Sequence, residues 1–389
     1  MHTRKINMGM VGGGPGSFIG KIHYNASLLD GEIQLVCGAF SSDYERSQQA
    51  GREYHVSSNR VYGSYEEMIW KEKERPEGER MDLLCIATPN HVHYGPAKLA
   101  LENGFHVISD KPLTYSTEEA EELVRLAEES GLLFALTHAY TGYPMVKEMK
   151  EMIARGELGR IRKVVSEYPQ GWLSEAIEKQ GNAQAGWRTD PERSGKSGCM
   201  GDIGTHALNL AEYVTGLRVT ELCADLSTMV EGRALDDDGN VLLRFDNGAR
   251  GVLYASQISA GEENGLRLRV YGEKGGLDWV QAEPNRLEVK WTDRPMEVRK
   301  PGNPYLSDLS LANTRMPPGH PGGLIEAFAN LYRNVAICLQ HWIAGKEPPV
   351  EAQDFPTVQD GLRGMQFIDS VVASAESTRK WIPFQQHSV

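Results

Sequence analysis

The beginning of the chain contains a short apolar run, a glycine-rich turn and a helical stretch, in that order. The apolar run covers residues 6–11, the turn reads Gly-Gly-Gly-Pro-Gly over 12–16, and the helical pattern covers 21–29. A strand that ends in such a turn and leads into a helix is the first unit of a parallel sheet whose strands alternate with helices. This arrangement limits the fold to the α/β class.

The glycine turn has the properties of a dinucleotide cradle. Gly12 permits the tight turn, Gly14 lets the backbone approach a pyrophosphate, and the following helix offers its first N–H groups to the anion. Pro15 interrupts the loop and Ser17 occupies the third small position, so an ordinary glycine-rich loop is the alternative. We expect a dinucleotide to contact this segment at Gly12, Gly13, Gly14, Gly16, Ser17, Phe18 and Ile19.

Apolar runs alternate with helical patterns through the rest of the first half. The runs cover residues 33–40, 82–87, 106–109 and 132–137, and the helical patterns cover 64–73, 95–103 and 118–130. This alternation predicts a doubly wound parallel sheet of the Rossmann type over residues 1–143, with ligands at the carboxyl ends of the strands. The residues that follow the third apolar run are therefore expected beside the cofactor: Thr88, Pro89, Asn90 and His93.

Two local patterns leave alternatives open. Such sheets usually carry an acidic residue that binds the adenosine ribose, and Ser41 stands at that position here. The negative charge that would repel a 2′-phosphate is therefore missing, and Arg46 would attract that phosphate. Asp43 either reaches the ribose or caps the next helix, and the choice between NAD(H) and NADP(H) stays open. His91 and His93 have a spacing that metal sites use, but no carboxylate or cysteine stands near them at ligand spacing, and we expect no metal.

The second half changes to the periodicity of strands. Predicted strands cover residues 162–168, 219–228, 241–245, 250–259, 266–271, 277–281 and 286–291. They predict an α+β domain over 144–389 with an open, largely antiparallel sheet. As an alternative, the helices at about 322–376 pack back on the first domain. One face of the sheet can carry helices and the other can pack on another subunit, so we expect a homodimer or homotetramer formed through this sheet.

The run of residues 198–206 carries the strongest chemical signal in the second half. Asp202 and His206 are four residues apart at a helix start, so they share one face, and Lys111 can be brought opposite them. The three side chains together suit proton transfer, whereas the simpler interpretation is a helix cap, a helix-face residue and a solvated lysine. A long polar segment, 171–198, leads into this run, and its Trp172, Trp187 and Arg188 either line a substrate pocket or pack within the segment.

Composition excludes several classes of partner. The chain has 41 Lys and Arg against 53 Asp and Glu, a net charge of −12, with no basic block, which argues against nucleic acid. Its 5 cysteines are scattered without a C-x-x-C pair, as expected for reduced thiols in a cytosol. We find no leader and no apolar run long enough to cross a bilayer, so we expect a cytoplasmic protein without a membrane partner.

Over nearly its whole length the chain resembles the glucose-fructose oxidoreductase, inositol dehydrogenase and MocA (Gfo/Idh/MocA) family of sugar and cyclitol dehydrogenases. Three motifs carry the resemblance: the glycine loop, the triplet Asp110-Lys111-Pro112 where the family has Glu-Lys-Pro, and Asp202-x-Gly204-x-His206, which matches D-x-G-x-H. The resemblance implies oxidation of a secondary alcohol of a polyol or sugar with a nicotinamide cofactor. In that activity Lys111 and His206 would be catalytic and Asp202 would orient the site near substrate hydroxyls.

The resemblance also implies details of the surroundings. The Lys111–Pro112 peptide bond would be cis and lie beside the nicotinamide, Asp110 would support it, and Tyr140 and Tyr143 would approach the substrate. Lys111 and His206 are then expected to converge above the reactive face of the cofactor. Two other functions remain as alternatives: a lyase or glycosidase that uses NAD transiently, and a non-catalytic regulator that senses a dinucleotide.

Overall fold

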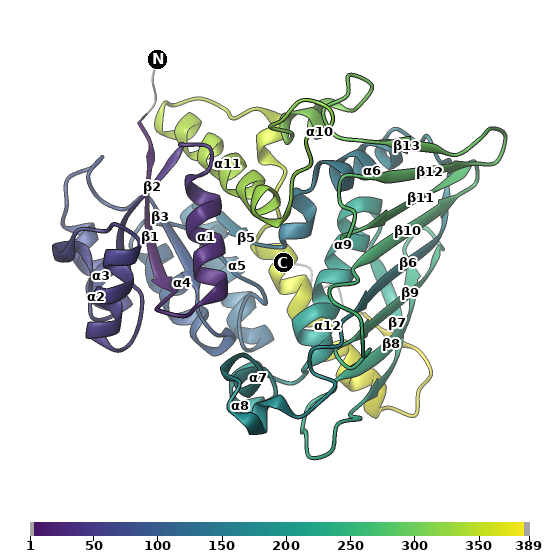
Figure 1. Ribbon diagram of the computed structural model, residues 1–389, viewed down its shortest axis with the longest axis horizontal. Coiled ribbons are helices and arrows are strands. Elements are labelled where there is room, and N and C mark those ends of the chain that lie inside the picture. The colour runs from purple at the N-terminus through teal and green to yellow at the C-terminus, as the bar shows by residue number, and fades with distance from the viewer. Residues whose placement is uncertain (1–3, 385–389) are drawn as a thin grey trace. The chain divides into compact units, whose positions relative to one another are not determined.

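The computed structural model describes residues 4–384, and the chain forms two compact units (Figure 1). Unit 1 comprises the chain up to Gly142 together with Leu324–Leu362, and unit 2 comprises Tyr143–Gly323 together with the chain from Arg363 onward. Residues 324–362, which the sequence analysis assigned to the second domain with packing on the first as the alternative, thus belong to unit 1.

Unit 1 is built on a five-stranded parallel sheet with the strand order β2-β1-β3-β4-β5. Its strands are β1 (Ile6–Gly12), β2 (Ile33–Ala39), β3 (Leu83–Ala87), β4 (His106–Ser109) and β5 (Phe134–Leu136). Every residue of β3 is buried, as expected for the centre of a parallel sheet that helices cover on both faces. The predicted doubly wound sheet of the Rossmann type is confirmed.

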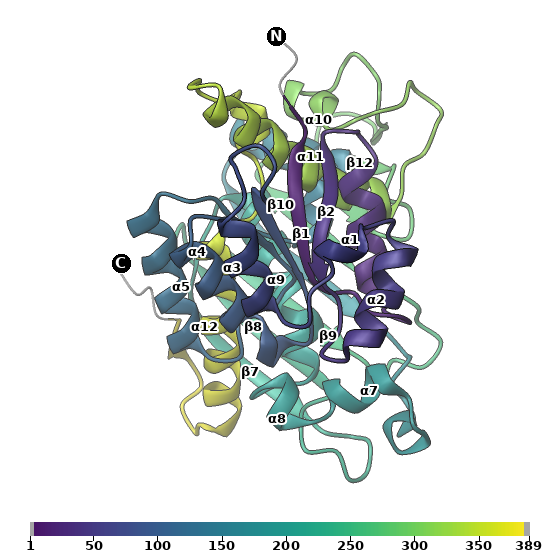
Figure 2. The same ribbon diagram turned by 90° about the vertical axis from the view of Figure 1, so that its left-hand side faces the viewer.

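The helices of unit 1 form a layer on each face of this sheet. They are α1 (Phe18–Leu28), α2 (Tyr44–Glu53), α3 (Tyr65–Lys73), α4 (Tyr94–Glu102), α5 (Thr117–Ser130) and α11 (Leu324–Ile343). Right-handed crossovers place α1 on one face, where α11 packs against it, and α3, α4 and α5 beside one another on the other face (Figure 2). The side chains of Ser17, Asp43, Ser64 and Ser116 cap α1, α2, α3 and α5.

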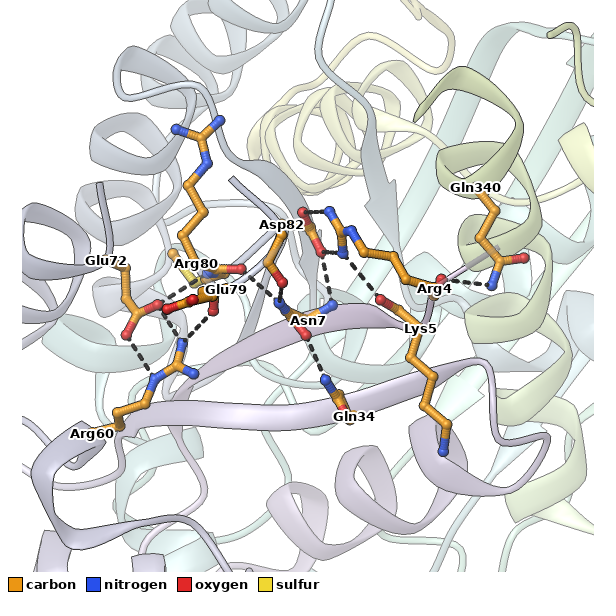
Figure 3. A network of polar contacts seen from close by, with 12 residues as sticks. Arg4, Lys5, Asn7, Gln34, Arg60, Glu72, Glu79, Arg80, Asp82 and Gln340 are labelled. Atoms are coloured by element: carbon orange, nitrogen blue, oxygen red, sulfur yellow. Dashed lines mark hydrogen bonds and ion pairs between the residues drawn. The ribbon is translucent and has the colours of Figure 1, made fainter. Parts of the chain in front are cut away.

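A network of polar contacts joins the beginning of β1 to the segment before β3 (Figure 3). The guanidinium group of Arg4 donates to both carboxylate oxygens of Asp82 at 2.7 Å, and the backbone N–H of Asn7 donates to Asp82 Oδ2 at 2.8 Å. The side-chain amide of Gln34 donates to Asn7 Oδ1 at 2.7 Å, which links β2 to the same group. These bonds satisfy polar groups at the edge of a buried sheet.

The carboxylate of Glu72 is the buried acceptor of the same region (Figure 3). It accepts from the Arg60 guanidinium, from the Tyr62 hydroxyl at 2.9 Å and from the backbone N–H of Met81 at 3.0 Å. A charge without any exposed side-chain surface is tolerated because Arg60 pairs with it and these donors surround it. Glu72 thereby connects α3 to the segments on both sides of it.

Unit 2 contains a nine-stranded mixed sheet with the order β13-β12-β11-β10-β6-β9-β8-β7-β14. The strands are β6 (Ile161–Pro169), β7 (Val219–Ser227), β8 (Asp238–Phe245), β9 (Arg250–Ser256), β10 (Arg267–Gly272), β11 (Gly275–Val280), β12 (Leu287–Trp291), β13 (Glu297–Arg299) and β14 (Ile382–Pro383). All neighbours are antiparallel except β6 and β9, so the predicted largely antiparallel sheet is confirmed. The sequence analysis missed β13 and β14 because such short edge strands carry no alternating apolar pattern.

Helices cover one face of this sheet (Figure 1). The helices of unit 2 are α6 (Pro144–Ala154), α7 (Ala183–Arg188), α8 (Pro191–Ser194), a π-helical turn (Met200–Gly204), α9 (Thr205–Thr215), α10 (Asp308–Ala312) and most of α12 (Val358–Glu376). α9 packs on β6, β9 and β10, and α6 packs on α9. Arg267 in β10 and Lys290 in β12 form ion pairs with Asp278 in β11. Assembly of subunits through this sheet stays a prediction.

Candidate functional site

The glycine loop lies at the carboxyl end of β1, where its backbone approaches the neighbouring strands. Gly12 has a φ of +87°, and a Cβ atom added to it would lie 2.3 Å from the carbonyl oxygen of Ala87 in β3. A Cβ atom on Gly14 would lie 2.9 Å from the carbonyl oxygen of Phe40. Both positions are therefore restricted to glycine by the close approach of other backbone.

The surroundings of this loop fit the anionic part of a dinucleotide. Ser17 closes the loop by donating its N–H to Gly14 O at 3.0 Å, and its hydroxyl caps α1 by accepting from Gly20 N at 3.1 Å. The first turn of α1, which contains Phe18 and Ile19, carries no acidic side chain, so its positive end faces no competing charge of its own. At the end of β3 the buried hydroxyl of Thr88 has no hydrogen-bond partner within residues 4–384, which provides a polar group for a ligand.

The corner after β2 brings three of the predicted cofactor residues together. Asp43 caps α2, its Oδ1 accepting from the N–H of Arg46 at 3.1 Å, and Ser41 Oγ accepts from the N–H of Asp43 at 3.2 Å. The Arg46 guanidinium donates to the carbonyl oxygen of Pro15 in the glycine loop at 3.3 Å. A serine hydroxyl and a guanidinium therefore flank the loop, while the carboxylate is engaged as a helix cap.

The Asp110-Lys111-Pro112 triplet follows β4. Asp110 Oδ1 accepts from the N–H of Lys111 and from the Thr137 hydroxyl, each at 3.0 Å, and the Lys111–Pro112 peptide bond is cis, as expected. Because the sheet is parallel, Lys111 lies at the same edge of the sheet as the glycine loop. The acidic residue of the triplet thus supports the lysine backbone and ties it to the end of β5.

His93 joins the loops that follow β3 and β4. Its Nδ1 lies 2.7 Å from Pro112 O and its Nε2 lies 2.9 Å from Thr88 O, so both ring nitrogens face carbonyl oxygens. Burial lowers the pKa of His93, and a neutral ring donates to only one of these two oxygens. Pro89 and the buried Asn90 lie in the chain between Thr88 and His93. Within residues 4–384 no cluster of His, Cys, Asp and Glu is arranged to hold a metal ion.

His138 is a site residue that the sequence analysis missed. It follows β5 and is buried, and burial together with the positive charge of Lys111 lowers its pKa to about 3. The sequence signal that could have found His138 is its place just after a predicted strand of the parallel sheet, where ligands bind. Tyr140 is buried in the short helix Ala139–Gly142 of unit 1, and Tyr143 lies in the core of unit 2, where its ring packs against Trp279 at 5.5 Å between centroids.

In unit 2 the π-helical turn presents Asp202, and His206 follows at the start of α9. Asp236 supports the beginning of this segment: its two carboxylate oxygens accept from the N–H groups of Gly198 at 2.8 Å and Met200 at 2.9 Å. Burial raises the pKa of Asp236. Wide turns of this kind inside helices are frequent at functional sites, because they change the direction in which side chains project.

The predicted pocket residues of the polar segment gather around Asp202. Arg188 Nε donates to Asp202 Oδ2 at 3.1 Å, and Gln257 Nε2 donates to the same oxygen at 2.9 Å. The Arg188 guanidinium lies 4.1 Å from the ring centre of Trp187 and 5.7 Å from that of Trp172. The structure therefore places two indole rings and one cation next to this carboxylate.

A row of neutral polar side chains next to His206 was also missed. The Tyr168 and His206 ring centroids are 6.2 Å apart, and the hydroxyl of Tyr168 and the amide of Gln170 both donate to Asn264 Oδ1 at 2.8 Å. Trp172 Nε1 donates to Gln170 Oε1 at 3.0 Å. Tyr168 lies in β6, and Gln170 and Trp172 follow the end of that strand, whereas Asn264 is 94 residues from Gln170 and carried no local signal.

Comparisons with known proteins identify the family of the chain. A model of the oxidoreductase family with an NAD-binding Rossmann fold matches residues 6–138, and a model of the GFO/IDH/MocA C-terminal domain matches 146–278. The uncharacterized oxidoreductase YfiI of Bacillus subtilis (strain 168) is 34% identical over 386 residues, which cover 98% of each chain. The chain belongs to the Gfo/Idh/MocA family.

Two solved structures match the chain over the whole fold. An oxidoreductase from Sinorhizobium meliloti has a TM-score of 0.87 with 42% identity, covering 97% of this chain and 99% of its own. An inositol dehydrogenase homolog from Azotobacter vinelandii, in complex with NADH and myo-inositol, has a TM-score of 0.90 with 33% identity and covers 98% of both chains. Unit 1 is thus the NAD-binding Rossmann fold of an oxidoreductase.

Proposed function

We propose that this chain transfers a hydride between NAD(P) and a secondary alcohol carbon of a sugar, glycoside or cyclitol. The observation that carries the proposal is the shell around Asp202 and His206, which consists of indole rings, a phenol and side-chain amides. Amide and hydroxyl groups exchange hydrogen bonds with the hydroxyls of a polyol, and indole faces cover its C–H surfaces. The Azotobacter vinelandii family member was crystallised with a cyclitol of this kind.

In this proposal the residues of the chain orient the substrate and transfer its hydroxyl proton. When bound, NAD(P) accepts or returns the hydride. His206 takes the hydroxyl proton from the alcohol, or returns it in reduction, as general base or acid, and Asp202 holds the environment in which it does so. Lys111 holds or relays the same proton, and its positive charge favours the oxygen at which negative charge develops. That Lys111 and His206 serve one substrate belongs to this proposal, as does the assignment of the cofactor residues.

The experiment begins with fluorescence titrations of the protein with NADH and NADPH. A panel of polyols, pyranoses, glycosides and inositols, with myo-inositol included, is then assayed in both redox directions. We expect Lys111→Met and His206→Asn to bind the preferred cofactor within about twofold of the unmodified protein and to lose turnover by about 10²–10⁴-fold, because positioned acid–base groups contribute at this level. The exposed Lys346→Met is the matched control and keeps full turnover.

Three outcomes would contradict parts of the proposal. Full turnover in Lys111→Met removes the lysine from the mechanism. Product without net change of NADH absorbance indicates a lyase or glycosidase that uses NAD transiently. Cofactor binding without turnover of any sugar or polyol favours a dinucleotide-sensing regulator.

A further inference from the structure

The carboxylate of Asp202 is held by two side chains that approach it from separate segments of unit 2. Arg188 is the last residue of α7, and Gln257 is the first residue after β9. We propose that Arg188 and Gln257 are positioning residues that keep Asp202 ionised and in one orientation. This inference rests on the proposed function, in which Asp202 acts beside the substrate.

The geometry of the two hydrogen bonds carries the first part of this inference. Arg188 Nε and Gln257 Nε2 lie 3.1 Å and 2.9 Å from the same oxygen, Asp202 Oδ2. Both nitrogens can donate and cannot accept a hydrogen bond, so they stabilise an oxygen that carries negative charge and oppose a carboxylic acid O–H at that position. Two donors on one oxygen also fix the plane of the carboxylate relative to the helix.

Burial makes these interactions stronger than surface contacts. The Asp202 and Arg188 side chains are 14% and 23% exposed, and Gln257 is 2% exposed. Solvent therefore screens the ion pair weakly, and Gln257 has little freedom to turn away. Removal of either donor takes away one of these two hydrogen bonds from a carboxylate that is largely shielded from water.

The segment that carries Arg188 is built to hold the guanidinium in place. Arg188 Nη1 donates to Gln184 Oε1 at 2.8 Å, and the guanidinium lies over the Trp187 ring at 4.1 Å. Asn182 caps α7 by accepting from the N–H groups of Gln184 and Ala185. A lysine cannot reproduce this planar stacking together with two directed hydrogen bonds, so the residue type matters and not the charge alone.

The test compares Arg188→Met, Arg188→Lys and Gln257→Leu with Arg294→Met. Arg294 is the matched control, because its guanidinium lies 3.7 Å over the Trp291 ring on an exposed edge of unit 2. Steady-state kinetics with NAD⁺ or NADP⁺ and the best polyol of the panel are measured from pH 5 to 10. The protonation midpoint of Asp202 is measured independently by carboxyl ¹³C NMR, with the signal assigned by its loss in Asp202→Asn.

We expect Arg188→Met to lower kcat about 10²-fold with little change in KM for the cofactor. We also expect the acid limb of the kcat/KM profile to move to higher pH by about one unit, because a tenfold increase in the affinity of Asp202 for a proton corresponds to one pH unit. Gln257→Leu gives a smaller change in the same direction. Arg188→Lys restores the pH limb but only part of kcat, and Arg294→Met changes neither.

Two results would overturn the inference: an Asp202 midpoint in Arg188→Met that equals that of the unmodified protein, or a loss of activity that appears only as lowered thermal stability. If the unmodified protein oxidises no polyol, the proposed function fails, and the NMR midpoint still decides whether Arg188 and Gln257 hold the carboxylate.

Discussion

Replacement of Gly12 by alanine gives the sharpest test of how the glycine loop is built. The new Cβ atom would lie 2.3 Å from Ala87 O, and the backbone has a φ of +87°. Gly31, in the turn after α1, provides a matched control, because its φ is +75° and, apart from its two chain neighbours, no atom of residues 4–384 lies within 4 Å of an added Cβ. The two variants therefore share the backbone strain and differ in the contact with β3.

The expected magnitudes follow from these two terms. A non-glycine residue in the left-handed region costs about 1–2 kcal/mol, and Gly31→Ala should lose about this amount. Overpacking against a buried strand adds about 1–3 kcal/mol, so Gly12→Ala should lose about 3 kcal/mol. For a unit of this size each kcal/mol lowers Tm by about 2–4 °C, and the middle of that range predicts a fall of about 3–6 °C for Gly31→Ala and about 9 °C for Gly12→Ala.

The assay measures thermal unfolding by circular dichroism and NADH binding by fluorescence titration. We expect Gly12→Ala to weaken NADH binding by at least about tenfold, because the loop must move away from β3, while Gly31→Ala binds NADH normally. Equal Tm values in the two variants would refute the argument, since the contact with Ala87 would then have no energetic consequence. Normal NADH binding in Gly12→Ala would separate the loop from the cofactor.

Three further predictions concern stability and cofactor choice. Burial lowers the pKa of His106 from 6.5 to about 4, and its Nδ1 accepts from the N–H of Leu133, so the unfolded chain binds a proton at this residue more readily than the folded chain does. In urea titrations the free energy of unfolding should therefore fall by about 2 kcal/mol between pH 7 and pH 5, and His106→Gln should not show this fall; equal falls in both proteins would contradict the prediction. Glu72→Gln removes the buried carboxylate that pairs with the partly buried Arg60 and should lower the free energy of unfolding by about 3–5 kcal/mol in denaturant titrations, whereas a change below about 1 kcal/mol would show that the pair is dispensable. Arg46→Ala should weaken NADPH binding about tenfold, or about 1.4 kcal/mol, and NADH binding less than twofold in fluorescence titrations; parallel changes would show that Arg46 does not face the 2′ position.

Local pattern was sufficient for most elements of the fold. The alternation of buried strands with capped helices in unit 1 follows from apolar runs, serine and aspartate caps and glycine turns, which are properties of neighbouring residues. Pro144 begins α6, at a position where a helix accepts proline because the missing N–H has no partner within the helix. No helix among the described residues is long and apolar enough to span a membrane.

Unit boundaries and side-chain partners depend on contacts between segments that are distant in the sequence. Residues 324–362 join unit 1 because α11 packs on α1, and nothing in the composition of α11 distinguishes that partner from the helices of unit 2. The edge strands β13 and β14 form only because a neighbour offers free backbone groups.

The candidate site shows the same division. Motif spacing was enough to select Lys111, Asp202 and His206, since a short segment carries each of them with its flanking glycine or proline. The partners of Asp202 required the folded chain: Arg188 and Gln257 stand 14 and 55 residues from it, and hydrogen bonds over such separations are formed by packing that no local propensity encodes. Residue type therefore determined which side chains can perform chemistry, and tertiary contacts decided which of them are buried and which groups they contact, because packing brings distant segments together.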